Sequence, residues 1–284
     1  MTFSDAFPLL VFGGPYSNLQ ATTGVLAEAR ARAIPPQNII CTGDVVAYCG
    51  DPDATAARIR EAGIRVVAGN CEEQLAADAD DCGCGFDEGT ACDRLSRDWY
   101  AFASRATSID SRAWMAGLPR RLDGTYRGRS IAVIHGTEAA SNQFLFGSET
   151  QAIRDAHAAV GADVVIAGHC GLPFAQAVGG GGWFNPGVVG VPANDGTCDV
   201  WFGTITPEPD SGLTFATHRL GYDHTSAAHA MRRSGHADPY AEALETGLWP
   251  SLDVLPRAER AATGQPIAEV RLRLPASASL ASVA

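Results

Sequence analysis

The chain has 284 residues and a net charge of −11, and all 21 of its basic residues are arginine. This acidic balance argues against a sequence-independent nucleic-acid partner, because such binding relies on basic surface. No segment reaches the ~18 consecutive apolar residues of a membrane span, and the N-terminus lacks the basic start of a signal peptide. We therefore expect a cytoplasmic protein without a membrane partner, built as one large α/β domain with or without a small appendage.

Five short apolar runs, each ending in glycine or a polar turn, predict buried β-strands. They read PLLVFGG, NIICTGD, IRVVAGN, SIAVIHG and ADVVIAGH. Helical patterns such as LQATTGVLAEARARA and DATAARIREAG separate the first three runs. Apolar strands that alternate with helices favour a sheet covered by helices on both faces.

The chain divides into regions of different composition. Residues 72–128 form an insertion in which an acidic, cysteine-rich loop is followed by a sequence pattern typical of helices. The segments after residue 180 predict shorter, antiparallel strands. We expect a domain over residues 1–220 and a helical C-terminal extension over residues 221–284, ending in a disordered SASLASVA.

Polar side chains stand at the ends of four predicted strands. They are Asp44, Asn70, His135 and His169. The carboxyl ends of strands line one crevice of an α/β sheet, so these side chains should converge. One carboxylate, one amide oxygen and two imidazoles suit divalent Zn, Mn or Fe. Taken singly, each residue is also compatible with a turn, a helix cap or a hydrogen-bonded structural histidine.

Five ordered blocks carry a family resemblance. GDVVAYCGDP, GNCEE, VIHG, AGHCGLPF and FNPGVVGVP resemble, in order and spacing, the calcineurin-like metallophosphoesterases, closest to their small bacterial phosphodiesterase branch, over roughly residues 8–220. The resemblance implies a four-layer α-β-β-α sandwich with a two-metal site. It also implies hydrolysis of a phosphomonoester or phosphodiester by a metal-activated water.

The resemblance matches only half of the family's metal site. Asp44 corresponds to the aspartate that the two metals share, and the other three strand-end residues correspond to the remaining ligands of one metal. The aspartate and histidine of the family's first block correspond to Gly14 and Tyr16, and its last histidine corresponds to Gly171. The histidine after the family's asparagine corresponds to Cys71. One metal site is therefore expected.

Cysteines offer one way to a second metal site. The candidate ligands are Cys49, Cys71, Cys82, Cys84, Cys92 and Cys170. Thiolates select softer metals such as Zn, Fe or Cu(I), and in a reducing compartment many cysteines indicate metal or redox roles. The alternative is a loop of small residues with incidental thiols.

The turn FGGPYSNLQ offers another way to compensate a phosphate charge. Its backbone N–H groups precede a helix that Ser17 or Asn18 can cap, and a helix N-terminus of this kind binds anions. Gly14, Tyr16 and Asn18 are therefore candidate substrate-binding residues. Tyr48 either contacts substrate or packs as a loop aromatic.

The sequence thus predicts a metal-dependent phosphoesterase that acts on a small-molecule phosphate ester. The alternatives are a non-hydrolytic, metal-dependent binding or sensor protein on the same fold, and a thiol-rich metal-handling protein. The apolar, tryptophan-containing segment ETGLWPSLDVLP could cover the core or a partner subunit, so a homo-oligomer is a further expectation.

Overall fold

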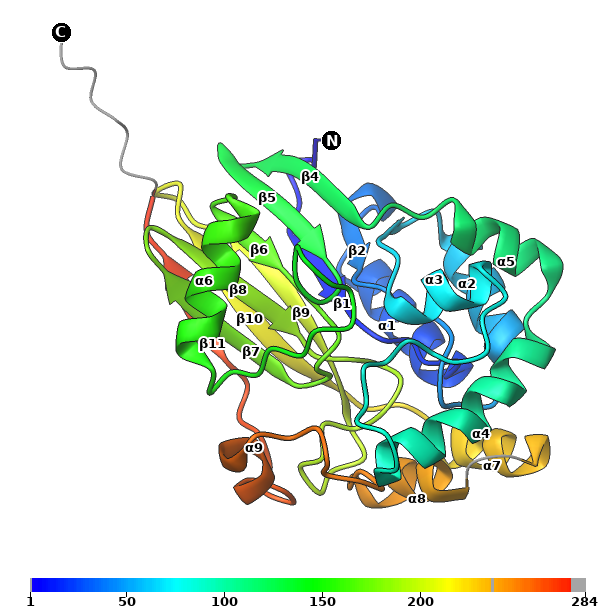
Figure 1. The fold of residues 1–284 in the computed structure, drawn as a ribbon. Coiled ribbons are helices and arrows are strands. Elements are labelled where there is room, and N and C mark those ends of the chain that lie inside the picture. Colours follow the sequence, from blue (N-terminus) through cyan, green and yellow to red (C-terminus); the bar gives the residue numbers. More distant parts are fainter. Residues whose placement is uncertain (1, 236–237, 277–284) are drawn as a thin grey trace, which may run out of the picture.

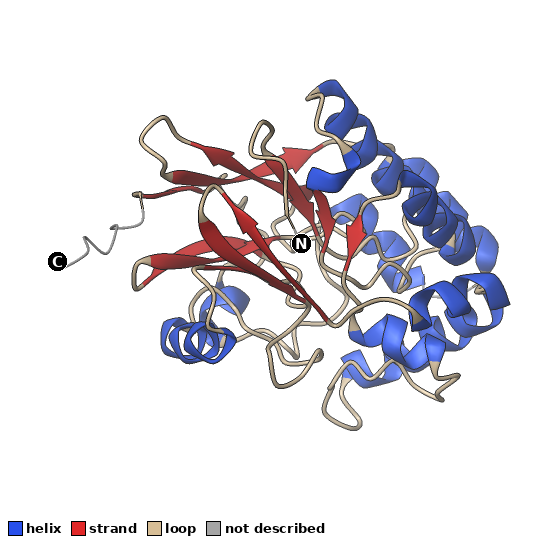
Figure 2. Cartoon of the chain, turned by 90° about the horizontal axis from the view of Figure 1, so that it is seen from above, coloured by secondary structure: helices blue, strands red, loops and turns tan. Residues whose placement is uncertain are grey.

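Two β-sheets pack face to face between layers of helices in the computed structural model, which describes residues 2–235 and 238–276 (Figures 1 and 2). The first sheet has the spatial order β11 (Arg271–Leu274), β10 (Leu213–Leu220), β9 (Val200–Pro207), β1 (Leu9–Phe12), β2 (Ile39–Cys41) and β3 (Arg65–Val66). The second has the order β4 (Arg121–Tyr126), β5 (Arg129–Ile134), β6 (Val164–Ile166), β8 (Gly181–Pro186) and β7 (Pro173–Val178). This is the four-layer arrangement expected from the sequence.

The strand directions place the carboxyl ends of the central strands at one edge of each sheet. Strands β1, β2 and β3 are parallel, and β9 continues the same sheet in the antiparallel sense. In the second sheet β5, β6 and β8 are parallel, with β4 and β7 antiparallel at the two margins. The five apolar runs are confirmed as strands, but they belong to two sheets.

Helices cover the outer faces of both sheets (Figure 1). Those gathered beside the first sheet are α1 (Leu19–Ala31), α2 (Pro52–Ala62), α3 (Asn70–Ala76), α4 (Ala91–Ala106), α5 (Ile109–Ala116), α7 (His224–Ser234) and α8 (Asp238–Thr246). The second sheet carries α6 (Thr150–Val160), and the short elements are η1 (Pro36–Asn38) and α9 (Arg257–Ala261).

Strand β1 shows why the apolar runs are continuous. Leu9 and Val11 belong to the cluster between the two sheets, whereas Leu10 and Phe12 belong to the cluster under the helices. Because successive side chains of a strand point to opposite faces, a strand covered on both faces must be apolar at every position.

The C-terminal part of the chain contributes to these same layers. Of the one or two short helices expected there, both are present, as α7 and α8. Strand β11, which the sequence analysis did not predict, pairs with β10. The SASLASVA segment, expected to be disordered, lies outside the described residues. None of the helices within the described ranges is both long and apolar enough to cross a membrane.

Candidate metal centre

The four predicted ligands lie just after strands of both sheets. Asp44 follows β2 and Asn70 begins α3 after β3, both in the first sheet, whereas His135 follows β5 and His169 follows β6 in the second. All four side chains are buried. The carboxyl ends of the two sheets therefore meet at one site.

Three of these side chains present ligand atoms to one another. Oδ2 of Asp44 lies 3.1 Å from Nε2 of His135, and the same nitrogen lies 3.1 Å from Nδ1 of His169. The three ligand atoms all lie within 4.8 Å of each other. A metal–ligand distance of about 2.1 Å separates ligand atoms at right angles by about 3.0 Å, which matches both short distances.

The hydrogen bond of Nδ1 in His135 determines which ring nitrogen carries a proton. Nδ1 of His135 lies 2.6 Å from the carbonyl oxygen of Thr42, so Nδ1 carries a proton and donates it there. A neutral His135 then points the lone pair of Nε2 at a carboxylate oxygen of Asp44. Either a proton on Nε2 or a metal ion removes the repulsion between these facing lone pairs, and a second ring N–H held by a carbonyl is typical of metal-ligating histidines.

Asn70, the fourth predicted ligand, offers a buried amide oxygen. Its Nδ2 donates to the carbonyl oxygen of Cys82 at 2.9 Å, which fixes the side chain. Its Oδ1 is buried and has no hydrogen-bond partner among the described residues. A buried polar atom without a partner is costly, so this oxygen suits a fourth ligand.

The pKa shifts of Asp44 and His169 favour ligand-competent protonation states, whereas the shift of His135 favours its protonated form until a metal displaces the proton. Burial raises the pKa of Asp44, but the nearby His135 outweighs burial, and the net shift is downward. Burial lowers the pKa of His135, yet Asp44 shifts it upward overall. Burial and His135 together lower the pKa of His169 to about 3, so its imidazole stays neutral. A carboxylate and neutral imidazoles are the forms that bind metals.

Backbone strain and close packing accompany the ligands. Asp44 has φ +55° and His169 has φ +62°, both in the left-handed region that side chains rarely adopt. Such strain clusters at functional sites. A Cβ at Gly69 would lie 2.2 Å from Oδ1 of Asp44, so only glycine permits this approach.

Glu72 orients the Asp44 loop, a role that the sequence analysis missed. Its carboxylate accepts hydrogen bonds from the backbone N–H groups of Asp44 at 2.7 Å, Val45 at 2.8 Å and Gly69 at 2.9 Å. Burial and Asp44 raise the pKa of Glu72 to about 7. Glu72 lies two residues after the candidate ligand Asn70 in GNCEE, and this proximity could have indicated its role from the sequence.

The other half of the family's metal site is filled by aromatic side chains. A Cβ at Gly14 would lie 2.4 Å from Cζ of Tyr16, so the Tyr16 ring occupies the space into which a side chain at position 14 would project. A Cβ at Gly171 would lie 3.3 Å from Cζ2 of Trp249. Trp249 is fixed by its Nε1, which donates to the carbonyl oxygen of Pro192 at 2.7 Å.

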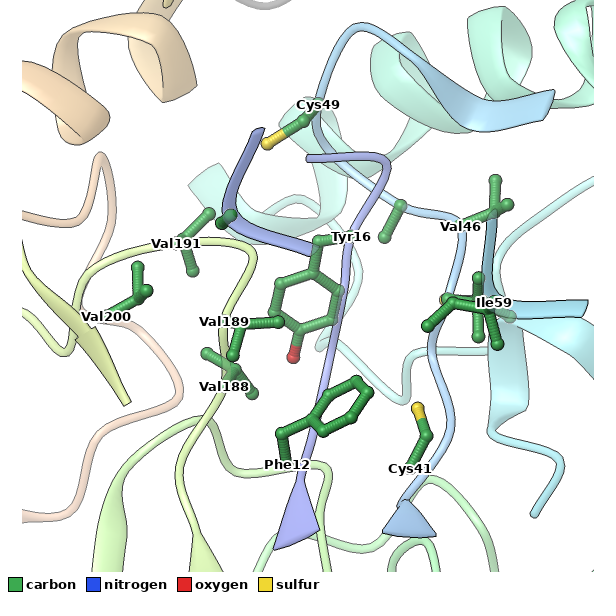
Figure 3. Packing of buried hydrophobic residues seen from close by; sticks show 14 of the residues in the cluster. Phe12, Tyr16, Cys41, Val46, Cys49, Ile59, Val188, Val189, Val191 and Val200 are labelled. Carbon is green, nitrogen blue, oxygen red and sulfur yellow. The ribbon is translucent and has the colours of Figure 1, made fainter. Parts of the chain in front are cut away.

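Tyr16 belongs to the hydrophobic core. Figure 3 shows its ring beside Val188 and Val189, above Phe12. Burial and the Asp44 carboxylate raise the pKa of its hydroxyl well above the usual value. The hydroxyl therefore stays protonated close to the candidate metal centre.

Tyr48 packs in an aromatic cluster, as one of its two predicted roles required. Its ring lies 4.8 Å from that of Tyr16, 4.9 Å from that of Trp99 and 4.6 Å from that of Tyr240. It also lines a pocket of about 60 Å³ that Tyr16, His169 and Trp249 share with it.

The opening turn does not offer its backbone N–H groups to an anion, contrary to expectation. Gly14 donates to the Gly43 carbonyl, Tyr16 to Asp44 and Ser17 to Val45, at 3.1, 3.1 and 2.9 Å. These donors join the turn to the Asp44 loop, which leaves them unable to bind phosphate.

Asn18 likewise has a structural role. Its Oδ1 accepts from the N–H of Ala21 at 3.0 Å, which confirms it as the helix cap. Its Nδ2 donates to the carbonyl oxygen of Gly190 at 2.8 Å. The side chain ties the turn to the segment after β8, and nothing in these contacts directs it toward a ligand.

The cysteines do not gather into a second metal site among the described residues. The one group of three or more His, Cys, Asp or Glu ligands found there contains no thiol. Cys82 and Cys84 are joined in a disulfide, whereas Cys92 is a buried free thiol. Close packing in small loops satisfies these sulfur atoms without a metal.

Cys71, Cys170 and Cys49 have protonated thiols, and the last two make hydrogen bonds to neighbouring residues. Burial and Asp44 raise the pKa of Cys71 well above its usual value. Burial raises the pKa of Cys170 to about 12, and its Sγ accepts from Nδ2 of Asn185 at 3.2 Å. Sγ of Cys49 donates to the Gly190 carbonyl oxygen at 3.5 Å, and burial raises its pKa too. In the absence of a metal these thiols are therefore neutral, and a metal would have to displace their protons to bind them.

The two-sheet sandwich with this strand-end centre defines a metallophosphoesterase-type protein. The chain matches the family model of the calcineurin-like phosphoesterase superfamily domain over residues 16–206, and it belongs to that superfamily. The match begins at Tyr16, within the opening turn.

Solved structures share this fold. A metallophosphoesterase from Sphaerobacter thermophilus is 19% identical with a TM-score of 0.67, and the match covers 85% of this chain and 99% of that one. The hypothetical protein PH1004 from Pyrococcus horikoshii OT3 is 16% identical with a TM-score of 0.69, covering 88% of this chain and 100% of that one. No curated protein matches the chain.

Proposed function

We propose that this protein hydrolyses a small-molecule phosphate ester at a single divalent transition metal, Zn, Mn or Fe, held by Asp44, Asn70, His135 and His169. The observation that carries the proposal is the convergence of the buried ligand atoms of Asp44, His135 and His169, with the tautomer of His135 fixed by Thr42. Membership of the calcineurin-like phosphoesterase superfamily supports the reaction class.

When bound, the metal supplies a Lewis acid for a phosphoryl oxygen and lowers the pKa of a coordinated water to about 7. The chain's own residues keep the ligand set in place: Glu72 anchors the Asp44 loop through backbone N–H groups, and Thr42 orients His135. The protonated Tyr16 hydroxyl offers a neutral hydrogen-bond donor close to Asp44. A neutral donor compensates phosphate charge less than a cation does, so we expect slow turnover and a preference for diesters or activated esters.

A second candidate function is metal binding without hydrolysis. It is favoured by the packing of Tyr16 against Gly14 and of Trp249 against Gly171, which closes the first-metal half of the site. A binder needs the metal but no room for an attacking water beside it.

The experiment begins with elemental analysis of protein purified without chelator, for which we expect about one transition metal per chain. Hydrolysis of aryl phosphomonoesters and diesters is then measured with added Mn, Fe, Zn or Mg. Activity that is lost in His169→Ala supports the esterase. Stoichiometric metal without turnover of any ester favours the binder, and folded protein that takes up no metal rules out both.

A further inference from the structure

One short loop supports two of the four candidate ligands. The carbonyl oxygen of Cys82 accepts the hydrogen bond from Nδ2 of Asn70 at 2.9 Å. Four residues on, the Phe86 ring stacks on Phe144 with centroids 6.2 Å apart, and the Phe144 ring lies 4.1 Å from that of His169. The conformation of this loop therefore bears on the positions of Asn70 and His169 together.

The disulfide between Cys82 and Cys84 restricts a loop that is otherwise free to rearrange. Gly83 and Gly85 have φ values of +61° and +74°, and glycine adopts many other backbone conformations at little cost. The N–H of Cys84 also donates to Sγ of Cys82 at 3.3 Å. Opening the S–S bond would release the Cys82 carbonyl that holds Asn70.

The disulfide is buried, but both of its cysteines line a pocket beside the loop. This pocket has a volume of about 400 Å³, and Asp81, Arg97 and Asn142 are among its other lining residues. Disulfides inside reducing compartments are typically transient or redox-sensing, in contrast to the permanent bridges of secreted proteins. The position of the bond beside this pocket, together with the cytoplasmic location expected from the sequence, favours a bond that opens and closes.

We propose that the Cys82–Cys84 disulfide is a redox-controlled positioning element for Asn70, so that its reduction weakens metal binding; this inference rests on the proposed metal centre. A protein dithiol is the reductant class. Its two thiols transfer two electrons and two protons: the S–S bond of the loop breaks, two loop thiols form, and the dithiol becomes a disulfide.

The test compares Mn²⁺ affinity in the two oxidation states of the full chain. Mn²⁺ prefers oxygen and nitrogen ligands, so the released thiols will bind it poorly and will not mask the effect. Reduction uses a phosphine, which takes up oxygen from water as the disulfide gains two hydrogens, and free Mn²⁺ is counted by electron paramagnetic resonance. We expect affinity at least about tenfold weaker after reduction, the scale seen when groups that support metal ligands are removed. Affinities that agree within about twofold would overturn the inference.

Variants separate the redox effect from unfolding. The Cys82→Ser/Cys84→Ser double variant should bind Mn²⁺ as weakly as reduced wild type, and phosphine should not change it further. Cys198→Ser, which removes a half-exposed thiol whose Sγ lies 3.2 Å from the Glu245 carbonyl oxygen, is the matched control and should keep full redox dependence. Near-ultraviolet circular dichroism verifies that each protein is folded. A folded double variant with wild-type affinity contradicts the inference.

The Asn70→Asp variant tests whether the disulfide affects metal binding through the hydrogen bond between Asn70 and Cys82. Aspartate keeps an oxygen ligand but has no N–H to donate to Cys82, so oxidised and reduced forms should bind Mn²⁺ with a ratio near one. A tenfold ratio that persists in Asn70→Asp rules out Asn70 as the coupled group. Oxidised wild type that binds no Mn²⁺, Zn²⁺ or Fe²⁺ overturns the metal centre itself, whereas binding without redox dependence overturns only this inference.

Discussion

The two halves of the metal site that the family resemblance implies differ in composition: one keeps ligand side chains and the other contains packed aromatic rings. In one half, Asp44, His135 and His169 keep buried ligand atoms pointed at a common position. In the other, Tyr16 lies over Gly14 and Trp249 lies against Gly171. Both halves contain residues with positive φ, but the first half is polar and the second is aromatic and packed as core.

The difference teaches that a metal ligand set can be replaced by packing instead of leaving a void. Close-packed interiors do not tolerate holes, so the glycines at positions 14 and 171 require bulk from elsewhere. The bulk comes from an adjacent residue, Tyr16, and from a distant one, Trp249. The surviving half keeps converging ligand atoms and an Asn70 Oδ1 that has no partner within the described part of the chain, which core packing alone would not require.

The largest expected effect lies in the aromatic half. Tyr16→Ala removes a buried ring from the core, and such truncations cost about 3–5 kcal/mol in the free energy of unfolding. Urea denaturation measures it, with Tyr16→Phe as the control that keeps the ring. A cost below about 1 kcal/mol for Tyr16→Ala would mean that the ring is not part of the core.

Next in size is the loss of a ligand charge from the polar half. Asp44→Asn keeps the shape of the side chain but removes the carboxylate, and we expect metal affinity about 100-fold weaker, equivalent to about 2.7 kcal/mol. Isothermal titration with Mn²⁺ or Zn²⁺ measures it. The exposed Asp110→Asn should bind as wild type, and wild-type affinity in Asp44→Asn would refute the assigned centre.

A smaller change in stability is expected from a substitution that tests whether the Tyr16 ring occupies the space of a side chain at position 14. Gly14→Ala should destabilise the protein by about 2 kcal/mol, because its Cβ would lie 2.4 Å from Cζ of Tyr16 and overpacking typically costs 1–3 kcal/mol. The same substitution in a Tyr16→Ala background should cost clearly less. Equal costs in the two backgrounds, measured as a double-mutant cycle, would show that Tyr16 does not occupy that space.

The smallest effect concerns the thiols. Cys170→Ser should leave metal stoichiometry unchanged and alter stability by no more than about 1 kcal/mol, because Sγ of Cys170 is protonated and already accepts from Asn185. Elemental analysis and thermal unfolding measure the two quantities. Loss of one metal equivalent would instead restore the predicted thiol-containing second site.

The sequence by itself determined the strands and the surviving ligands. Continuous apolar runs such as β1 predict strands buried on both faces, and a polar residue after such a run must lie at a strand end. Asp44, Asn70, His135 and His169 follow from that local rule, as does Asn18 as a helix cap. Each of these features depends on residues close together in the chain.

Only the tertiary structure decided what fills the other half. Gly14 and Tyr16 are two residues apart, yet the direction of the Tyr16 ring depends on the fold of the turn and on Val188 and Val189 across the core. Trp249 reaches Gly171 from a segment nearly eighty positions further along. The N–H groups of the opening turn donate to carbonyl oxygens of the Asp44 loop, which is also a contact between segments far apart in the chain. Spacing along the chain specifies which side chains reach a strand end, but only three-dimensional packing specifies which of them share one volume.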